Sequence, residues 1–165
     1  MESVALWYEA HVGGWMPKEV FVFLVSMVPL IELRGGLLLS SILNIPLLSA
    51  NLICIIGNII PIPFILLFIK QILKFMKDHG WFVKFVNWLE NRATKKSKGV
   101  EKGEFVFLWL FVGIPLPGTG AWTGSLIASL MNFDIKKASL AILIGILTAA
   151  VIMDIVSYGV LGMLF

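Results

Sequence analysis

The chain has 165 residues and a net charge of +3, with 59% hydrophobic residues, 14% charged residues and a mean hydropathy of +0.95. A soluble domain of this size cannot bury so much apolar surface. The composition therefore excludes a soluble domain and predicts an all-α multi-pass membrane protein with about four to six apolar segments of ~20 residues or fewer.

Residue types needed for metal, redox or catalytic chemistry are scarce. A single cysteine, Cys54, excludes an internal disulfide and a cysteine-based metal cluster, and His11 and His79 lack ligand-like spacing. The sequence contains no Ser-His-Asp candidate, P-loop or H-E-x-x-H motif. We therefore expect no metal, no cofactor and no enzymatic activity, and an ATP-driven pump is excluded for this chain alone.

Basic residues are concentrated in the middle of the chain. Nine of the thirteen fall between Lys70 and Lys102. Such a run could bind nucleic acid, but in a membrane protein it is more typical of a cytoplasmic loop, because cytoplasmic loops carry an excess of Lys and Arg. We expect residues 70–104 to be cytoplasmic and no nucleic acid to bind.

Apolar segments of two lengths alternate along the chain. Segments 47–69 and 138–159 can cross ~30 Å of hydrocarbon as helices, and the first should bend or unwind at its Gly57–Pro63 interruption. The shorter segments come in pairs, each of which we expect to form a re-entrant hairpin. The expected domains are an interfacial N-terminal segment (1–16), repeat 1 (17–70, with hairpin 19–44 and span 47–69), a basic amphipathic linker (71–104) and repeat 2 (105–165, with hairpin 105–132 and span 138–159).

The most distinctive stretch is Gly113-Ile-Pro-Leu-Pro-Gly-Thr-Gly-Ala-Trp-Thr-Gly-Ser125. Ile114 and Leu116 each precede a proline, which disfavours helical backbone, and Gly118 and Gly120 supply conformations that other residues avoid. The helix must therefore stop here. Broken backbone at membrane depth survives only where protein buries it or where it lines a wet cavity. We interpret the stretch as a binding site; the alternative is a kink at a helix contact.

The first half of the chain repeats in the second half at a spacing of 88 residues. Under this shift Pro29 falls on Pro117, Gly36 on Gly124, Asn44 on Asn132 and Gly57 on Gly145, without a gap. If each repeat is a hairpin plus one crossing helix, the basic loop and the Lys136–Lys137 pair lie on the same side of the membrane. The repeats are then inverted, both termini lie outside, and the two hairpin tips meet near the midplane.

Pro29-Leu-Ile-Glu-Leu-Arg-Gly-Gly36 and the 113–125 stretch, with the chain length and the basic middle loop, resemble the putative small multidrug export proteins. That family is distantly similar to the DedA (VTT-domain) membrane proteins. The resemblance implies drug export, two facing re-entrant loops and, from the DedA relatives, translocation of polyprenyl phosphate lipid carriers. Of the acid and arginine pattern typical of DedA proteins, only Glu32 and Arg34 are comparable in kind.

Glu32 and Arg34 are costly within a membrane unless they are paired or hydrated. In one interpretation Arg34 holds an anionic group of the substrate and Glu32 is a proton or cation site. In the other they form an ion pair that fixes the loop. If Gly35 and Gly36 open a helix, its N-terminus would add positive potential to the site.

The predicted substrate-binding set joins these four residues to the central stretch: Pro115, Pro117, Gly118, Thr119, Gly120, Trp122, Thr123 and Ser125. The hydroxyl groups could bind substrate or merely cap helices. Trp122 could form a wall of the site, or it could face lipid or pack against another helix. In addition to Glu32, Asp154 is a candidate for proton coupling; alternatively, it hydrogen-bonds to backbone groups that a broken helix leaves free. Asn58 and Thr148 are candidates for lining the cavity.

These residues lead to three hypotheses. The first is a plasma-membrane secondary transporter or flippase that moves an amphipathic, anionic, lipid phosphate-like substrate between the loops, with proton coupling through Glu32 or Asp154. The second is a proton-coupled exporter of small cationic drugs, and the third is a non-transporting membrane scaffold. The expected partners are membrane lipids and a small-molecule or lipid substrate, and the small size is compatible with a homodimer.

Overall fold

The structure is a computed structural model that describes residues 2–80, 83–84, 87, 91, 103–116 and 118–160. These residues form helices joined by short turns, and no strand occurs among them, as the composition predicts. The helices are α1 (Glu2–His11), α2 (Lys18–Met27), α3 (Glu32–Ile42), α4 (Leu47–Ile59), α5 (Pro61–Asp78), α7 (Glu104–Gly113), α8 (Ala121–Leu130), α9 (Ile135–Asp154) and a π-helical extension, η1 (Ile155–Val160). Most of the predicted linker, 71–104, lies outside the described residues.

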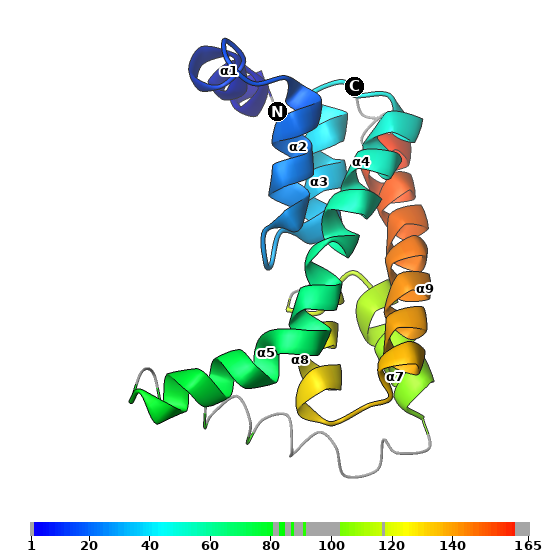
Figure 1. Cartoon of the computed structure of the whole chain (residues 1–165). Coiled ribbons are helices and arrows are strands. Elements are labelled where there is room, and N and C mark those ends of the chain that lie inside the picture. The colour runs from blue at the N-terminus through cyan, green and yellow to red at the C-terminus, as the bar shows by residue number, and fades with distance from the viewer. Residues whose placement is uncertain are drawn as a thin grey trace.

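Two long helical units run in opposite directions along the molecule, and one of them ends in a helix, α5, that turns outward at the lower end (Figure 1). One is α4 followed by α5, and the other is α9 followed by η1. The α2–α3 hairpin lies beside the upper half of these units and the α7–α8 hairpin beside the lower half, so the hairpin tips meet near the middle. The stretches Leu47–Asp78 and Ile135–Gly159 are long and apolar enough to cross a membrane.

The interruption in the first long unit is a bend rather than an unwound segment. Ile60, between α4 and α5, keeps helical dihedral angles (φ −53°, ψ −45°). Pro61 and Pro63 lie in the first turn of α5, where a missing N–H is tolerated. The helix then continues to Asp78, and Gly80 follows in a left-handed conformation (φ 71°), which suits a helix end.

The ends of α3 and α8 have the same backbone hydrogen bonds, 88 residues apart. Ile45 N donates to Ser40 O at 2.9 Å, and Phe133 N donates to Ala128 O at 3.0 Å. Asn44 (φ 52°) and Asn132 (φ 58°) adopt the left-handed conformation that closes each helix. The spacing found in the sequence therefore pairs positions with the same local structure.

Helix packing around two glycines is also similar. A Cβ atom at Gly57 would lie 2.8 Å from Phe23 O on α2, and one at Gly145 would lie 3.1 Å from Trp109 O on α7. Each long unit therefore packs closely on the first helix of its hairpin because a side chain is absent. Such small-residue contacts are typical of helix pairs in membranes.

Each hairpin also contacts the far end of the other long unit. Ser41 Oγ on α3 donates to Ser157 O in η1 at 2.7 Å. Ser129 Oγ on α8, at the corresponding position, donates to Leu66 O in α5 at 3.3 Å. These crossed contacts tie the two halves of the molecule together at both ends.

Candidate functional site

The site that the sequence singles out lies where the two hairpin tips meet. We define the tip junction as the α2–α3 turn (28–31) with the first turn of α3, together with the α7–α8 turn (114–120) and the first turn of α8. Helix α7 ends at Gly113, Ile114 is extended (φ −84°, ψ 120°), and Gly118 (φ 77°) and Gly120 (φ 138°) have positive φ. The predicted break in the helix is confirmed. Pro117 lies outside the described residues, and Pro115 is half-buried within the turn.

The first hairpin has a tighter tip than its sequence suggested. Helix α3 begins at Glu32, and Gly35 N already donates to Ile31 O at 2.9 Å, so Gly35 and Gly36 lie inside the helix. The expectation that these glycines open the helix is wrong, because the chain turns earlier through positive φ at Leu30 and Glu32. Gly36 instead allows close packing, since a Cβ there would lie 2.8 Å from Cys54 Sγ.

Glu32 joins the two hairpins through its carboxylate, although the side chain is only 3% exposed. Its Oε2 accepts from Ala121 N and its Oε1 from Trp122 N, both at 3.0 Å. These are the first N–H groups of α8, which have no partner within their own helix. A carboxylate at a helix N-terminus also complements the helix dipole. Glu32 therefore caps α8 from a position 89 residues earlier in the chain.

Arg34, two residues further along α3, binds the other side of the α7–α8 turn. Its Nη1 donates to Leu116 O at 2.7 Å and Thr119 O at 3.1 Å. Its Nη2 donates to Val112 O and Ile114 O, each at 3.1 Å. These carbonyl groups follow the last turn of α7 or belong to it, so a cation there satisfies backbone acceptors that the broken helix leaves free. Arg34 is thereby engaged entirely by backbone.

The second hairpin contributes one bond in return. Trp122 Nε1 donates to Met27 O at the end of α2, at 3.0 Å. Within the turn, Thr119 Oγ1 lies within hydrogen-bonding distance of Ile114 O and Leu116 O, at 3.0 and 2.9 Å. The tip junction is thus a network in which side chains satisfy backbone groups of both broken elements.

Asn58, on α4, lies beside the Glu32 carboxylate. The residue is 2% exposed, and its Oδ1 has no hydrogen-bond partner in the part of the chain that the structure describes. A buried acceptor without a donor is unfavourable by about 1–3 kcal/mol. Asn58 therefore marks a place at the tip junction where a donor group, from a ligand or a water molecule, would be stabilised.

Ser125 and Thr148 have protein partners for their hydroxyl groups. Ser125 Oγ donates to Ala121 O within α8 at 2.6 Å, and Thr123 is half-buried on the same helix. Thr148 Oγ1 donates to Ile144 O and accepts from Trp109 Nε1, so it fastens α9 to α7.

Asp154 is not part of the tip junction. Asn51 Nδ2 donates to its two carboxylate oxygens at 2.9 and 3.0 Å, near the beginning of α4. Asn51 was not among the predicted residues, although an amide one turn into a largely apolar helix is a signal of such a contact.

The comparison with known families gives one match. Residues 32–152 match the family described as "Putative small multi-drug export protein". No curated protein and no solved structure matches the chain. The matched range begins at Glu32 and includes every tip-junction residue from there to the first turn of α8.

Proposed function

The chain belongs to the family described as "Putative small multi-drug export protein", and from this premise we propose that it is a proton-coupled secondary transporter that exports amphipathic organic cations. The observation that carries the proposal is the Glu32 carboxylate, buried at the tip junction and bonded to the first two N–H groups of α8. An ionisable residue inside a membrane is a functional candidate because its burial is otherwise costly.

In the proposed architecture the two hairpins are re-entrant and belong to inverted repeats. The matched ends of α3 and α8, the paired glycine contacts and the crossed serine bonds support this arrangement. Such repeats place a substrate site near the midplane, between broken helices. The tip junction would be that site.

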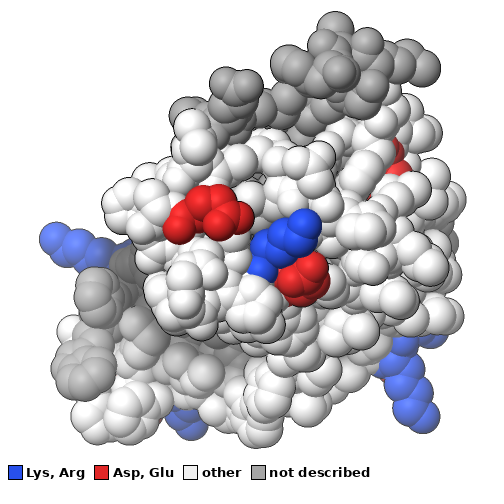
Figure 2. Space-filling view, turned by 90° about the horizontal axis from the view of Figure 1, so that it is seen from above, with Lys and Arg blue, Asp and Glu red and all other residues white. Residues whose placement is uncertain are grey.

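The distribution of charge supports one orientation. The end of the molecule where α4 begins has a largely uncharged surface with a few adjacent acidic and basic groups (Figure 2). The opposite end carries Lys70, Lys74 and Lys77 on α5 and Lys136 and Lys137 on α9. We propose that the lysine-rich end is cytoplasmic, because cytoplasmic segments carry an excess of basic residues. Residues 2–16 would then lie outside.

Glu32 would act as the switch. Hydrogen bonds to a charged group contribute about 1.5–3 kcal/mol each, roughly twice the value for neutral groups. A proton on Glu32 would therefore weaken both bonds to α8 and remove the charge that complements its N-terminus. The α7–α8 tip would then be held mainly by Arg34, and movement of this tip would open a path to Glu32 and Asn58.

The acceptors at the tip junction favour a cation. The carboxylate of Glu32 and the unpartnered Oδ1 of Asn58 both suit a ligand with N–H donors or positive charge. Arg34, in contrast, is engaged by four carbonyl groups. Competition of proton and cation for Glu32 would produce antiport, which is the coupling needed for proton-driven export.

A second candidate is transport of an anionic amphiphile, which a distant relationship to DedA proteins would imply. One observation favours it: the N-terminus of α8 already binds a carboxylate, that of Glu32. When Glu32 leaves, a phosphate group could take the same two N–H donors, since helix N-termini bind anions well.

The test is transport by purified protein in vesicles with an imposed pH gradient. We expect wild-type protein to move a fluorescent lipophilic cation in response to the gradient, and Glu32→Gln protein to lose this response at every pH. Glu19→Gln, which changes an acid in the first turn of α2 away from the tips, is the matched control and should retain it. Monodisperse elution and unchanged tryptophan fluorescence would show that each variant folds.

The other outcomes separate the alternatives. Movement of a fluorescent phosphate-bearing lipid, but not of the cation, would replace the first candidate by the second. If Glu32→Gln protein folds and transports the cation with an unchanged pH response, Glu32 is structural and the proposed coupling is wrong. Failure of wild-type protein to move either probe would favour a scaffold.

A further inference from the structure

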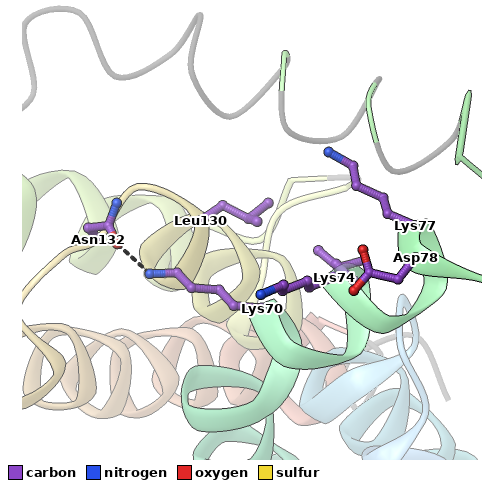
Figure 3. Close-up of a pocket in the computed structure, with 7 residues that line it drawn as sticks. Lys70, Lys74, Lys77, Asp78, Leu130 and Asn132 are labelled. Atoms are coloured by element: carbon purple, nitrogen blue, oxygen red, sulfur yellow. Dashed lines mark hydrogen bonds between the residues drawn. The ribbon is translucent and has the colours of Figure 1, made fainter.

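A cavity distant from the hairpin tips lies at the lysine-rich end of the molecule. It has a volume of about 490 Å³ and lies between the second half of α5 and the end of α8. It is lined by Lys70, Leu73, Lys74, Lys77, Asp78, Leu130 and Asn132 (Figure 3). Lys70 Nζ donates to Asn132 Oδ1, which holds one cation at the α8–α9 turn. With three lysines and one aspartate, the lining favours an anion.

An apolar groove of about 250 Å³ lies next to this pocket along α5. Its α5 side is formed by Ile62, Pro63, Leu66 and Leu67, and its other side by Ile135, Ser139, Leu143 and Ile146 of α9. The polar and apolar cavities share one face of α5, because positions 62/63, 66/67, 70, 73/74 and 77 recur at helical spacing. They also meet at the α8–α9 turn, where Asn132 in the turn lines the pocket and Ile135, the first residue of α9, lines the groove.

The combined surface therefore changes from apolar to cationic within one turn of α5. A membrane lipid has the same order of groups, with acyl chains followed by a charged headgroup. Basic pockets between helices on the cytoplasmic side of membrane proteins suit anionic headgroups. A free phosphate would use the pocket but gain nothing from the groove, whereas an anionic lipid would use both.

We propose that this surface binds an anionic phospholipid, with the phosphate group between Lys70 and Lys74 and an acyl chain in the groove between α5 and α9. This site is separate from the tip junction and does not depend on the proposed transport. It would hold α5 against the α8–α9 turn, where Lys70 and Asn132 already meet.

The test is binding of phosphatidylglycerol to the full chain in neutral detergent, measured by native mass spectrometry beside phosphatidylcholine with the same acyl chains. Each lysine near an anionic headgroup is worth about 1 kcal/mol, so Lys70→Gln/Lys74→Gln should weaken phosphatidylglycerol binding about 30-fold. Lys136→Gln/Lys137→Gln is the matched control, because it removes the same charge from exposed positions that line neither cavity.

A second variant tests the groove without changing charge. Ser139→Phe would fill the groove from its exposed α9 side and should also weaken phosphatidylglycerol binding. Equal binding of the two lipids by wild-type protein would overturn the proposal. An equal loss of phosphatidylglycerol affinity in the Lys70→Gln/Lys74→Gln and Lys136→Gln/Lys137→Gln proteins would also overturn it. Undiminished binding by Ser139→Phe, or equally tight binding of glycerol phosphate, would overturn the assignment of an acyl chain to the groove.

Discussion

The two hairpins have similar frameworks but different tips. Both α3 and α8 end in the same turn at an asparagine, and a glycine from the following helix packs on the first helix of each hairpin. The α2–α3 tip is short and turns through positive φ at Leu30 and Glu32. The α7–α8 tip is longer, contains prolines and leaves N–H and carbonyl groups that the α2–α3 hairpin must satisfy.

This difference shows a division of roles between related elements. The first hairpin supplies charged side chains, and the second supplies backbone groups without helical partners. Neither tip is stable alone, because a buried carboxylate, a half-buried guanidinium and free backbone groups are each unfavourable in a membrane. Substitutions that remove the charges of the first hairpin should therefore lower the stability of the protein more than substitutions in the framework that the two hairpins share.

The largest effect is expected from Arg34→Met, which leaves four carbonyl groups without their donor and Glu32 without a neighbouring cation. Breaking a buried charged network by removing one partner typically costs about 3–5 kcal/mol. We expect a decrease of that size in the free energy of unfolding, measured by denaturant titration in mixed micelles and followed by tryptophan fluorescence.

Lys18→Met is the matched control for this experiment. Lys18 also donates to carbonyl groups at a helix end, those of Leu43 and Asn44, but at the outer end of the first hairpin. Lys18 is half-buried like Arg34, but it makes two such bonds rather than four, and water can replace it at this outer end. The loss should therefore be at most about 1 kcal/mol. Similar losses for the two variants would contradict the distinction between the tips and the framework.

A smaller effect is expected from Gly120→Ala. Gly120 has φ 138°, and a Cβ there would lie 2.7 Å from the Glu32 Cδ. The substitution therefore combines backbone strain of about 1–3 kcal/mol with displacement of the carboxylate that caps α8. Differential scanning fluorimetry should show a clear decrease in the melting temperature.

Gly118→Ala separates these two causes. Gly118 also has positive φ, 77°, but among the described residues no atom outside its chain neighbours lies within 4 Å of the position of its Cβ. Only the left-handed conformation is then penalised, by about 1–2 kcal/mol. If Gly118→Ala lowered the melting temperature as much as Gly120→Ala, the contact with Glu32 would contribute nothing to stability.

The breaks and bends of the backbone could be predicted from the sequence more completely than the contacts between the tips. Proline and glycine placement predicted the break after Gly113 and the bend near Pro61, because these effects are local to the backbone. Glu32 and Arg34 were identified as important, but their partners were not. Residues 32 and 121 are far apart in sequence, and only the folded hairpins bring the carboxylate to the N-terminus of α8.

The smallest effect, and the most direct measure of how similar the hairpins are, is expected at Asn44 and Asn132. Both adopt left-handed backbone, which glycine accepts without strain. Asn44→Gly and Asn132→Gly should therefore each raise the free energy of unfolding by at most about 1 kcal/mol. The gain should be smaller at Asn132, because its Oδ1 also accepts from Lys70 and that bond would be lost. In a Lys70→Gln background the bond is absent before and after Asn132→Gly, so this substitution should there raise the free energy of unfolding as much as Asn44→Gly does, measured by the same unfolding titration. A loss of stability at one asparagine together with a gain at the other would mean that the two helix ends are not equivalent in the folded protein.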